Sequence, residues 1–162
     1  MRKTQIASFI LLLVLLACKP STENAHNFNT KLVGVNNSLQ SNLTSLSGLV
    51  TSVLKSHDFS NLTFKVNNSK NDLDRCEAEV KKYPAPEGGE KFKTAVLDYI
   101  KAVKEITDTY ALLSKLPKTA TEKEVSTIMG KINKLYETEE AKMKAAQIAQ
   151  EEFAKANRLQ LK

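Results

Sequence analysis

The chain has 162 residues, the size of one ordinary domain, and carries a formal net charge of +6. Two of its basic residues, Arg2 and Lys3, fall in a segment that we expect to be removed, which leaves +4 on the mature chain. Acidic and basic residues alternate through the second half, whereas a nucleic-acid-binding domain gathers positive charge on one face, so this pattern argues against a nucleic-acid partner. The low content of Gly and Pro, together with abundant Ala, Leu, Lys and Glu, favours helices over strands.

The N-terminal segment has the order of an export signal. Arg2 and Lys3 precede an apolar run over residues 6–16, which is too short to span a bilayer as a stable helix. The run ends in a tetrapeptide that resembles the lipobox of bacterial lipoproteins, with an aliphatic residue, a permissive position, a small residue and a cysteine: Leu15, Leu16, Ala17 and Cys18. The sequence therefore predicts a lipoprotein signal peptide over residues 1–17. The alternatives are an ordinary signal peptide or an N-terminal membrane anchor.

Cleavage would leave Cys18 as the new N-terminus, with its thiol carrying a diacylglycerol. Each acyl chain contributes about 0.8 kcal/mol per buried CH₂, so an anchor of two or three chains would hold the protein firmly to a membrane. Residue 19 is Lys rather than Asp, and by resemblance to Gram-negative sorting rules this gives no inner-membrane retention signal. We therefore expect a lipid-anchored protein of the outer membrane, on its periplasmic or cell-surface face.

Residues 18–27 are polar after the cysteine, include Pro20 and lack apolar periodicity, which predicts a short flexible tether. Residues 28–162 form the expected helical domain. Its first two helices are predicted over residues 28–56 and 60–82, since apolar residues recur every three or four positions in both. Asp58 or Ser60 can cap the second helix, and the break near His57 is the weakest of the predicted turns.

The third helix is predicted over residues 90–116, after a loop with two prolines and two glycines in residues 83–89, and Pro117 ends it. Thr121 and Glu124 form a capping box for the fourth helix, which can continue to the C-terminus. We also expect i,i+4 ion pairs from Glu140 to Lys144 and from Glu151 to Lys155.

Four amphipathic helices with short connections predict an all-α, antiparallel up-down-up-down four-helix bundle. The alternative is a longer two- or three-helix hairpin that dimerises. Charge is unevenly distributed along this bundle. Residues 19–69 hold four basic and two acidic residues and are rich in Asn, Ser and Thr, whereas 18 basic and 16 acidic residues follow from Lys70 onward. Cys76 falls on the apolar stripe of the second helix, which favours a buried, unreactive thiol.

We find no pattern that points to catalysis, a cofactor or a metal. His26 and His57 are far apart, and neither has a second histidine at i+4. Glu139 falls on the apolar stripe of the fourth helix, where we expect it to lie at the edge and reach solvent rather than act as a ligand. Four tyrosines could stack on a ligand, although helical spacing favours the core for two of them, Tyr99 and Tyr110: Tyr83, Tyr99, Tyr110 and Tyr136.

The segment from Pro84 to Leu116 resembles a family of small helical-bundle bacterial surface lipoproteins of unknown function. The resemblance rests on the Pro-x-Pro-x-Gly-Gly loop at residues 84–89, the run from Phe92 to Lys101, and Asp108-Thr109-Tyr110 before a leucine pair. It extends through the last helix and the lipobox. The resemblance implies an exported helical bundle and carries no activity, because the family has no established catalytic residues.

These observations lead us to expect a non-enzymatic, lipid-anchored envelope protein that binds another macromolecule, an unidentified protein partner. The alternative is a carrier of a small apolar ligand, such as a lipid, between the helices. The stripes are filled with large aliphatic and aromatic residues, which suits a closed core and favours the first function. An enzyme is the third and least favoured reading.

Overall fold

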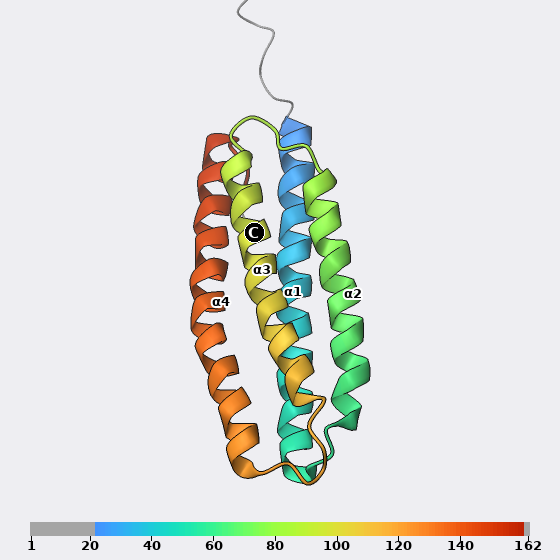
Figure 1. Cartoon of the computed structure of the whole chain (residues 1–162). Coiled ribbons are helices and arrows are strands. Elements are labelled where there is room, and N and C mark those ends of the chain that lie inside the picture. Colours follow the sequence, from blue (N-terminus) through green and yellow to red (C-terminus); the bar gives the residue numbers. More distant parts are fainter. Residues whose placement is uncertain (1–21, 161–162) are drawn as a thin grey trace, which may run out of the picture.

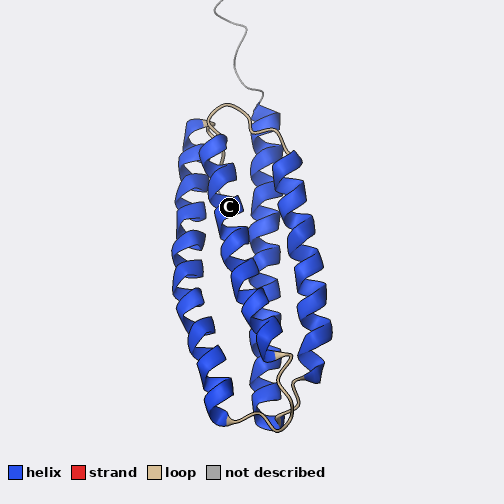
Figure 2. Cartoon of the chain, in the orientation of Figure 1, coloured by secondary structure: helices blue, strands red, loops and turns tan. Residues whose placement is uncertain are grey.

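The protein is an antiparallel four-helix bundle. The computed structural model describes residues 22–160, so that the predicted signal peptide, the lipobox and Cys18 lie outside the described residues. The helices are α1 (Thr22–Ser56), α2 (Ser60–Lys82), α3 (Glu90–Leu113) and α4 (Glu122–Ala156). They alternate in direction along the bundle axis (Figure 1), and the described residues contain no strand (Figure 2). The predicted fold is therefore confirmed.

The apolar stripes form one continuous core. Every stripe residue predicted for the first three helices is buried, from Phe28 in α1 to Leu113 in α3. In α4 the stripe is only partly buried, since Ile128, Leu135 and Met143 are half-exposed and pack on its edge. Helices α1 and α3 each pack against all three others. The contact of α3 with α4 is the most extensive, whereas that of α1 with α4 is the smallest of the helix contacts.

Helix α1 begins six residues earlier than expected. Residues 22–27, which their polar composition assigned to the tether, are helical, and the prediction of a flexible tether is wrong for them. Ala25 explains the extension, because it lies three positions before Phe28 and continues the same stripe with none of its surface exposed. Glu23 in the first turn adds a favourable interaction with the helix dipole.

The weakest predicted break, near His57, is present, and α1 and α2 are separate helices. His57 has a φ of 53°, in the left-handed region that ends helices. Asp58 then holds the start of α2, because its Oδ1 accepts hydrogen bonds from the Ser60 backbone N–H (3.2 Å) and the Ser60 hydroxyl (2.6 Å). The N-cap residue itself is Phe59, which makes no side-chain capping bond.

Helix α3 ends at Leu113, three residues before the predicted end. The backbone N–H groups of Lys115 and Leu116 donate to carbonyls three residues back, at 3.2 and 3.1 Å, which tightens the chain before Pro117. The capping box of α4 is confirmed, since the Glu124 N–H donates to Thr121 Oγ1 (3.3 Å) and the Thr121 N–H donates to Glu124 Oε2 (2.8 Å).

Helix α4 ends at Ala156, so the prediction that it can continue to the C-terminus is wrong. Arg158 has a φ of 56°, and its N–H donates to Lys155 O (3.2 Å). The Leu159 N–H donates to Ala154 O (2.8 Å), and its side chain packs against the core. This is a Schellman ending with arginine where glycine is usual, which is why composition did not predict it.

Candidate functional site at the N-terminal end of the bundle

Three segments meet at one end of the bundle: the start of α1, the loop over residues 83–89 and the C-terminus of α4 (Figure 1). The four residues predicted to direct lipidation precede α1 and lie outside the described residues: Leu15, Leu16, Ala17 and Cys18. Cys18 is four residues before Thr22, a length that spans at most about 14 Å when fully extended. Whatever Cys18 carries is therefore held close to this end.

Aromatic packing closes the core at this end. The rings of Phe28, Phe92 and Phe153 contact one another with centroid separations of 5.3–6.0 Å. The loop lies on the cluster at Gly89, where a Cβ atom would be 3.1 Å from Phe28 Cε1 and 3.0 Å from the backbone oxygen of Pro86. A larger residue at position 89 would therefore have to push Pro86 or Phe28 aside by a few tenths of an ångström, which shows how closely the loop lies on the bundle.

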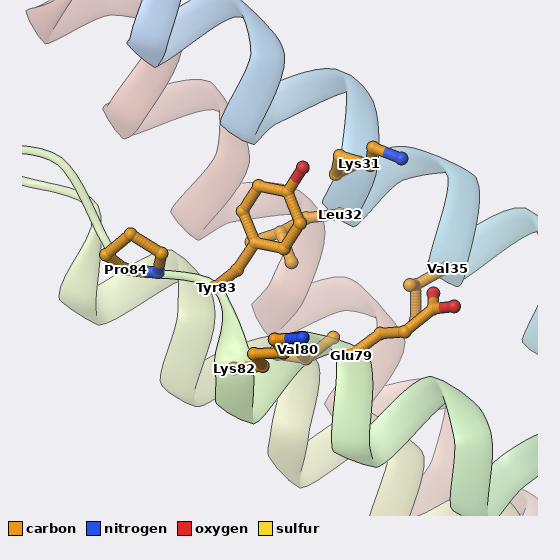
Figure 3. Close-up of a pocket in the computed structure, with 8 residues that line it drawn as sticks. All are labelled: Lys31, Leu32, Val35, Glu79, Val80, Lys82, Tyr83 and Pro84. Atoms are coloured by element: carbon orange, nitrogen blue, oxygen red, sulfur yellow. The ribbon is translucent and has the colours of Figure 1, made fainter.

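A cleft of about 410 Å³ opens beside this loop, between α1 and the C-terminal end of α2. Leu32 and Val35 form its α1 wall, and Val80 and Tyr83 form the opposite wall (Figure 3). Pro84 closes the loop side. The volume lies within the range of small-molecule sites, about 300–1,000 Å³, and the lining is mostly apolar.

The wall that carries Tyr83 is fixed by hydrogen bonds to its backbone. The Tyr83 N–H donates to Glu79 O (3.2 Å), which continues α2 by one bond. Lys93 Nζ, on α3, donates to Tyr83 O (2.5 Å) and to Lys81 O (3.2 Å). The lysine therefore satisfies carbonyls at the end of α2 and joins the cleft wall to α3.

Three charged residues line the mouth of the cleft: Lys31 on α1, with Glu79 and Lys82 on α2. Lys31 and Lys82 make no ion pair among the described residues, whereas the neighbouring Lys81 is paired with Glu77. Figure 3 shows the Tyr83 ring reaching towards α1, with its hydroxyl on the side where Lys31 lies. The mouth therefore combines a net positive charge with a hydroxyl group.

The same α1–α2 seam continues into a polar pocket of about 480 Å³, lined mainly by Asn and Ser from α1 and by charged residues of α2. Cys76 is the sole cysteine in the described part of the chain, and it lies at the base of this pocket, buried as predicted. Burial and, to a smaller extent, the charge of Glu79 raise the pKa of its thiol, which keeps the sulfur protonated and unreactive. The pocket therefore offers amide and hydroxyl groups rather than a nucleophile.

The prediction that Glu139 reaches solvent is wrong, because only 8% of its surface is exposed. Burial raises the pKa of its carboxyl, and the negative charge of Glu140 adds to this, whereas the Tyr99 hydroxyl opposes it. The Tyr99 hydroxyl is itself buried and makes no hydrogen bond of standard geometry. The two groups place polar atoms in the contact between α3 and α4, although the neighbouring stripe residues Leu135 and Met143 are half-exposed.

The other predicted tyrosines and histidines do not converge on a site. Tyr110 is buried, and its hydroxyl lies 3.1 Å from that of Tyr136, a hydrogen bond between α3 and α4. His26 lines a polar groove between α1 and α4, while His57 lies at the opposite end of α1 with its ring 6.4 Å from Phe59. Of the predicted ligand-stacking tyrosines, Tyr83 alone lines the apolar cleft.

The lysines of the cleft could not be singled out from the sequence. Leu32, Val35 and Val80 follow the core periodicity, and the two lysines resemble the other solvated lysines of their helices. Their position at one cleft depends on the register of α1 against α2, which makes Lys31 and Lys82 line it from its two sides. The one available indication was Tyr83, an aromatic residue directly before the prolines of the loop.

Comparisons with known proteins add no relative: no protein-family model, curated protein or solved structure matches this chain. Within residues 22–160, no helix is long and apolar enough to cross a bilayer. In the same part of the chain, no three His, Cys, Asp or Glu side chains lie together as metal ligands would. The positive features that remain are the position of α1 relative to Cys18, the exposed face of α1 and the cleft.

Proposed function

We propose that the protein is a lipid-anchored, non-enzymatic binding module of the bacterial cell envelope. Acyl chains on Cys18 hold it to the outer membrane, and the helical domain binds a protein partner. The position of α1 carries the proposal. This helix starts four residues after Cys18 and is 35 residues long, about 50 Å, so a lipid at Cys18 would hold one end of a long bundle against the bilayer.

The outer face of α1 supports a binding role for the domain. Asn37, Thr44 and Thr51 lie seven residues apart, and all three are exposed. No residue of α1 makes an ion pair within residues 22–160, so a partner would not have to break ionic contacts to reach this face. A long, neutral surface of amide and hydroxyl groups favours recognition by hydrogen bonding and shape rather than by charge.

We also propose membership of the lipoprotein family that residues 84–116 resemble. The residues that carry this resemblance have structural roles that a shared fold would retain. Pro86 and Gly89 hold the loop against Phe28. The side chains of Phe92 and Tyr99 lie in the core, and Asp98 pairs with Lys142 of α4 at 2.8 Å. These roles concern the fold, so the family assignment adds location and architecture to the proposal and no chemistry.

The two cysteines give a matched test of the anchor. The protein is expressed in a Gram-negative host with labelled palmitate, as wild type, Cys18→Ser and Cys76→Ser. We expect label and outer-membrane fractionation in the wild type and in Cys76→Ser, because Cys76 is buried in the bundle. Cys18→Ser should take up no label. Equal labelling of Cys18→Ser would rule out the proposed anchor.

The binding face is tested by adding charge to one helix at a time. Thr44→Arg combined with Thr51→Arg places two arginines on the exposed face of α1. The matched control, Ser126→Arg combined with Asn133→Arg, makes the same change at the same spacing on the exposed face of α4. We expect partner capture by in-cell cross-linking to be lost in the first variant and kept in the second. Partner capture that is kept in both variants would contradict a partner site on α1.

A further inference from the structure

We propose that the cleft between α1 and the C-terminal end of α2 binds a long-chain fatty acid, with its hydrocarbon tail on the apolar walls and its carboxylate at the lysine-bearing mouth. This site is separate from the proposed partner surface on α1 and does not depend on a lipid at Cys18. It also differs from a ligand enclosed between the helices, because the core at this end of the bundle is filled by Phe28, Phe92 and Phe153.

The apolar walls argue for a hydrocarbon tail. Leu32, Val35 and Val80 line an opening of about 410 Å³ but are almost fully buried, so the apolar surface open to a ligand comes mainly from half-buried Tyr83 and exposed Pro84. Tyr83 and Pro84 add a rigid aromatic and aliphatic wall, since Lys93 holds the Tyr83 carbonyl. Covering such a surface removes apolar area from water at about 25 cal/mol per Å², which favours an aliphatic occupant over a polar one.

The charges at the mouth argue for an anionic head. Lys31 and Lys82 come from the two helices that form the cleft, and neither is paired among the described residues. Glu79 is the single acidic residue of the lining, so the mouth keeps a net charge of +1. A carboxylate next to Lys31 can also accept a hydrogen bond from the Tyr83 hydroxyl, which Figure 3 shows on that side of the cleft.

The chain's own acyl groups are the weaker occupant. A lipid at Cys18 would have to leave the bilayer to reach residues 31–35, at a cost of about 0.8 kcal/mol per CH₂ withdrawn. A free fatty acid is not covalently linked to further acyl chains that remain in the bilayer. Its single tail also matches one narrow cleft, whereas a diacyl lipid would leave its second tail in water.

The test uses residues 19–162, which contain all four helices and the complete core, and therefore measures the cleft without the anchor. Palmitate binding is followed by isothermal calorimetry at concentrations below its micelle formation, with hexadecanol as the uncharged analogue and palmitoyl-lysophosphatidylglycerol as the phosphate-bearing one. We expect one palmitate per chain and weaker binding of hexadecanol. Absence of saturable palmitate binding, or binding of the lysophospholipid alone, would overturn the assignment.

Charge variants test the geometry. Lys31→Glu combined with Lys82→Glu should weaken palmitate binding at least tenfold and leave hexadecanol binding within about twofold. Glu79→Gln should strengthen palmitate binding a few-fold, because it removes the opposing charge. The control, Lys55→Glu combined with Lys131→Glu, changes the net charge equally at exposed positions that do not line the cleft and should match the wild type. An equal loss in the control would show non-specific attraction and overturn the proposal.

Tyr83→Ala tests the wall. It removes the ring and the hydroxyl together, so both palmitate and hexadecanol should bind at least fivefold more weakly. Circular dichroism and thermal unfolding establish that each variant is folded, and the exposed lysine variants keep the test valid if Tyr83→Ala unfolds. Unchanged palmitate binding in folded Tyr83→Ala and in the double lysine variant would place the ligand elsewhere.

Discussion

Helices α1 and α4 have the same length, 35 residues, yet they are held in the bundle in different ways. Helix α4 contains thirteen charged residues, and ion pairs connect it to α3 through Lys91 with Glu152 and Lys142 with Asp98. Helix α1 contains three charged residues, Glu23, Lys31 and Lys55, and none of them is ion-paired within the described residues. The comparison shows that a complete apolar stripe is enough to place a helix that has almost no electrostatic contacts.

The polar contacts of α1 are correspondingly few. Between α1 and the other helices, the structure has a hydrogen bond from Ser69 Oγ to Asn42 Oδ1 (3.2 Å) and one from Gln40 Nε2 to Met143 Sδ (2.9 Å). Asn29 and Asn36 each bury a side-chain oxygen that has no hydrogen-bond partner. Together with the Asn, Ser and Thr content, which disfavours helix interiors, these features make α1 the helix whose stability depends most on packing.

The largest expected effect comes from truncating one core leucine in α1 and one in α2, a helix that ion pairs join to α3. Leu39→Ala in α1 and Leu73→Ala in α2 both truncate a side chain with no exposed surface, and each should lower the free energy of unfolding by about 2–5 kcal/mol. Urea unfolding measures this loss. Amide hydrogen exchange should then separate the two, with Leu39→Ala raising exchange mainly in α1 and Leu73→Ala raising it throughout. The same exchange pattern in both variants would show that α1 does not open independently of the other helices.

A smaller effect is expected at the start of α4. Thr121→Ala removes the capping box and should lower the free energy of unfolding by about 0.5–2 kcal/mol. Thr127→Ala, one and a half turns into the same helix, is the control. Its hydroxyl donates only to Lys123 O, so alanine there should be neutral or slightly stabilising. A larger loss for Thr127→Ala would contradict the capping account.

The smallest effect is the dependence on pH, which should arise in α2–α4 and not in α1. Hydrogen bonds from Lys104 and Lys81 lower the pKa of Glu77 to about 2 from 4.5, so its stabilising contribution is complete above about pH 4.5 and is lost as the pH falls towards 2. Burial raises the pKa of Glu139, so its contribution has the opposite sign and favours the folded state at low pH. The ion pairs of Glu77 lie at the protein surface, where such pairs contribute about 0.2–1 kcal/mol.

Urea unfolding at pH 3, 5 and 7 measures both contributions. Glu77→Gln should reduce the loss of stability on acidification, and Glu139→Gln should raise the stability at pH 7 more than at pH 3. Amide exchange in α1 should follow the global change without an added local one. A local acid-induced opening of α1 alone would contradict the comparison.

Periodicity was sufficient to predict the fold, because each stripe residue of the first three helices faces the core. Predictions of helix ends and of burial were wrong where a residue occupied a position that is unusual for its type. Ala25 carried the helix into a polar segment, Arg158 took the position usual for glycine, and Glu139 was buried. The expected i,i+4 pairs of Glu140 and Glu151 do not form among the described residues.

The ion pairs that do form mostly join different helices. Lys70 pairs with Asp108 at 2.7 Å, and Lys104 pairs with Asp74 at 2.6 Å, both between α2 and α3. The cleft escaped prediction for the same reason, since the register of α1 and α2 must be known before Lys31 and Lys82 can be placed at the same cleft. Features that lie within one helix can be predicted from its pattern, whereas features between helices depend on how the helices pack.

Intact-mass analysis of the protein purified from membranes tests the central claim, the lipid on Cys18, most directly. The account predicts a chain whose first residue is Cys18, with a mass increase equal to a diacylglycerol, with or without a third acyl chain, and fragmentation that places the increase on that residue. A chain that begins at another residue, or that begins at Cys18 with no added mass, would contradict it.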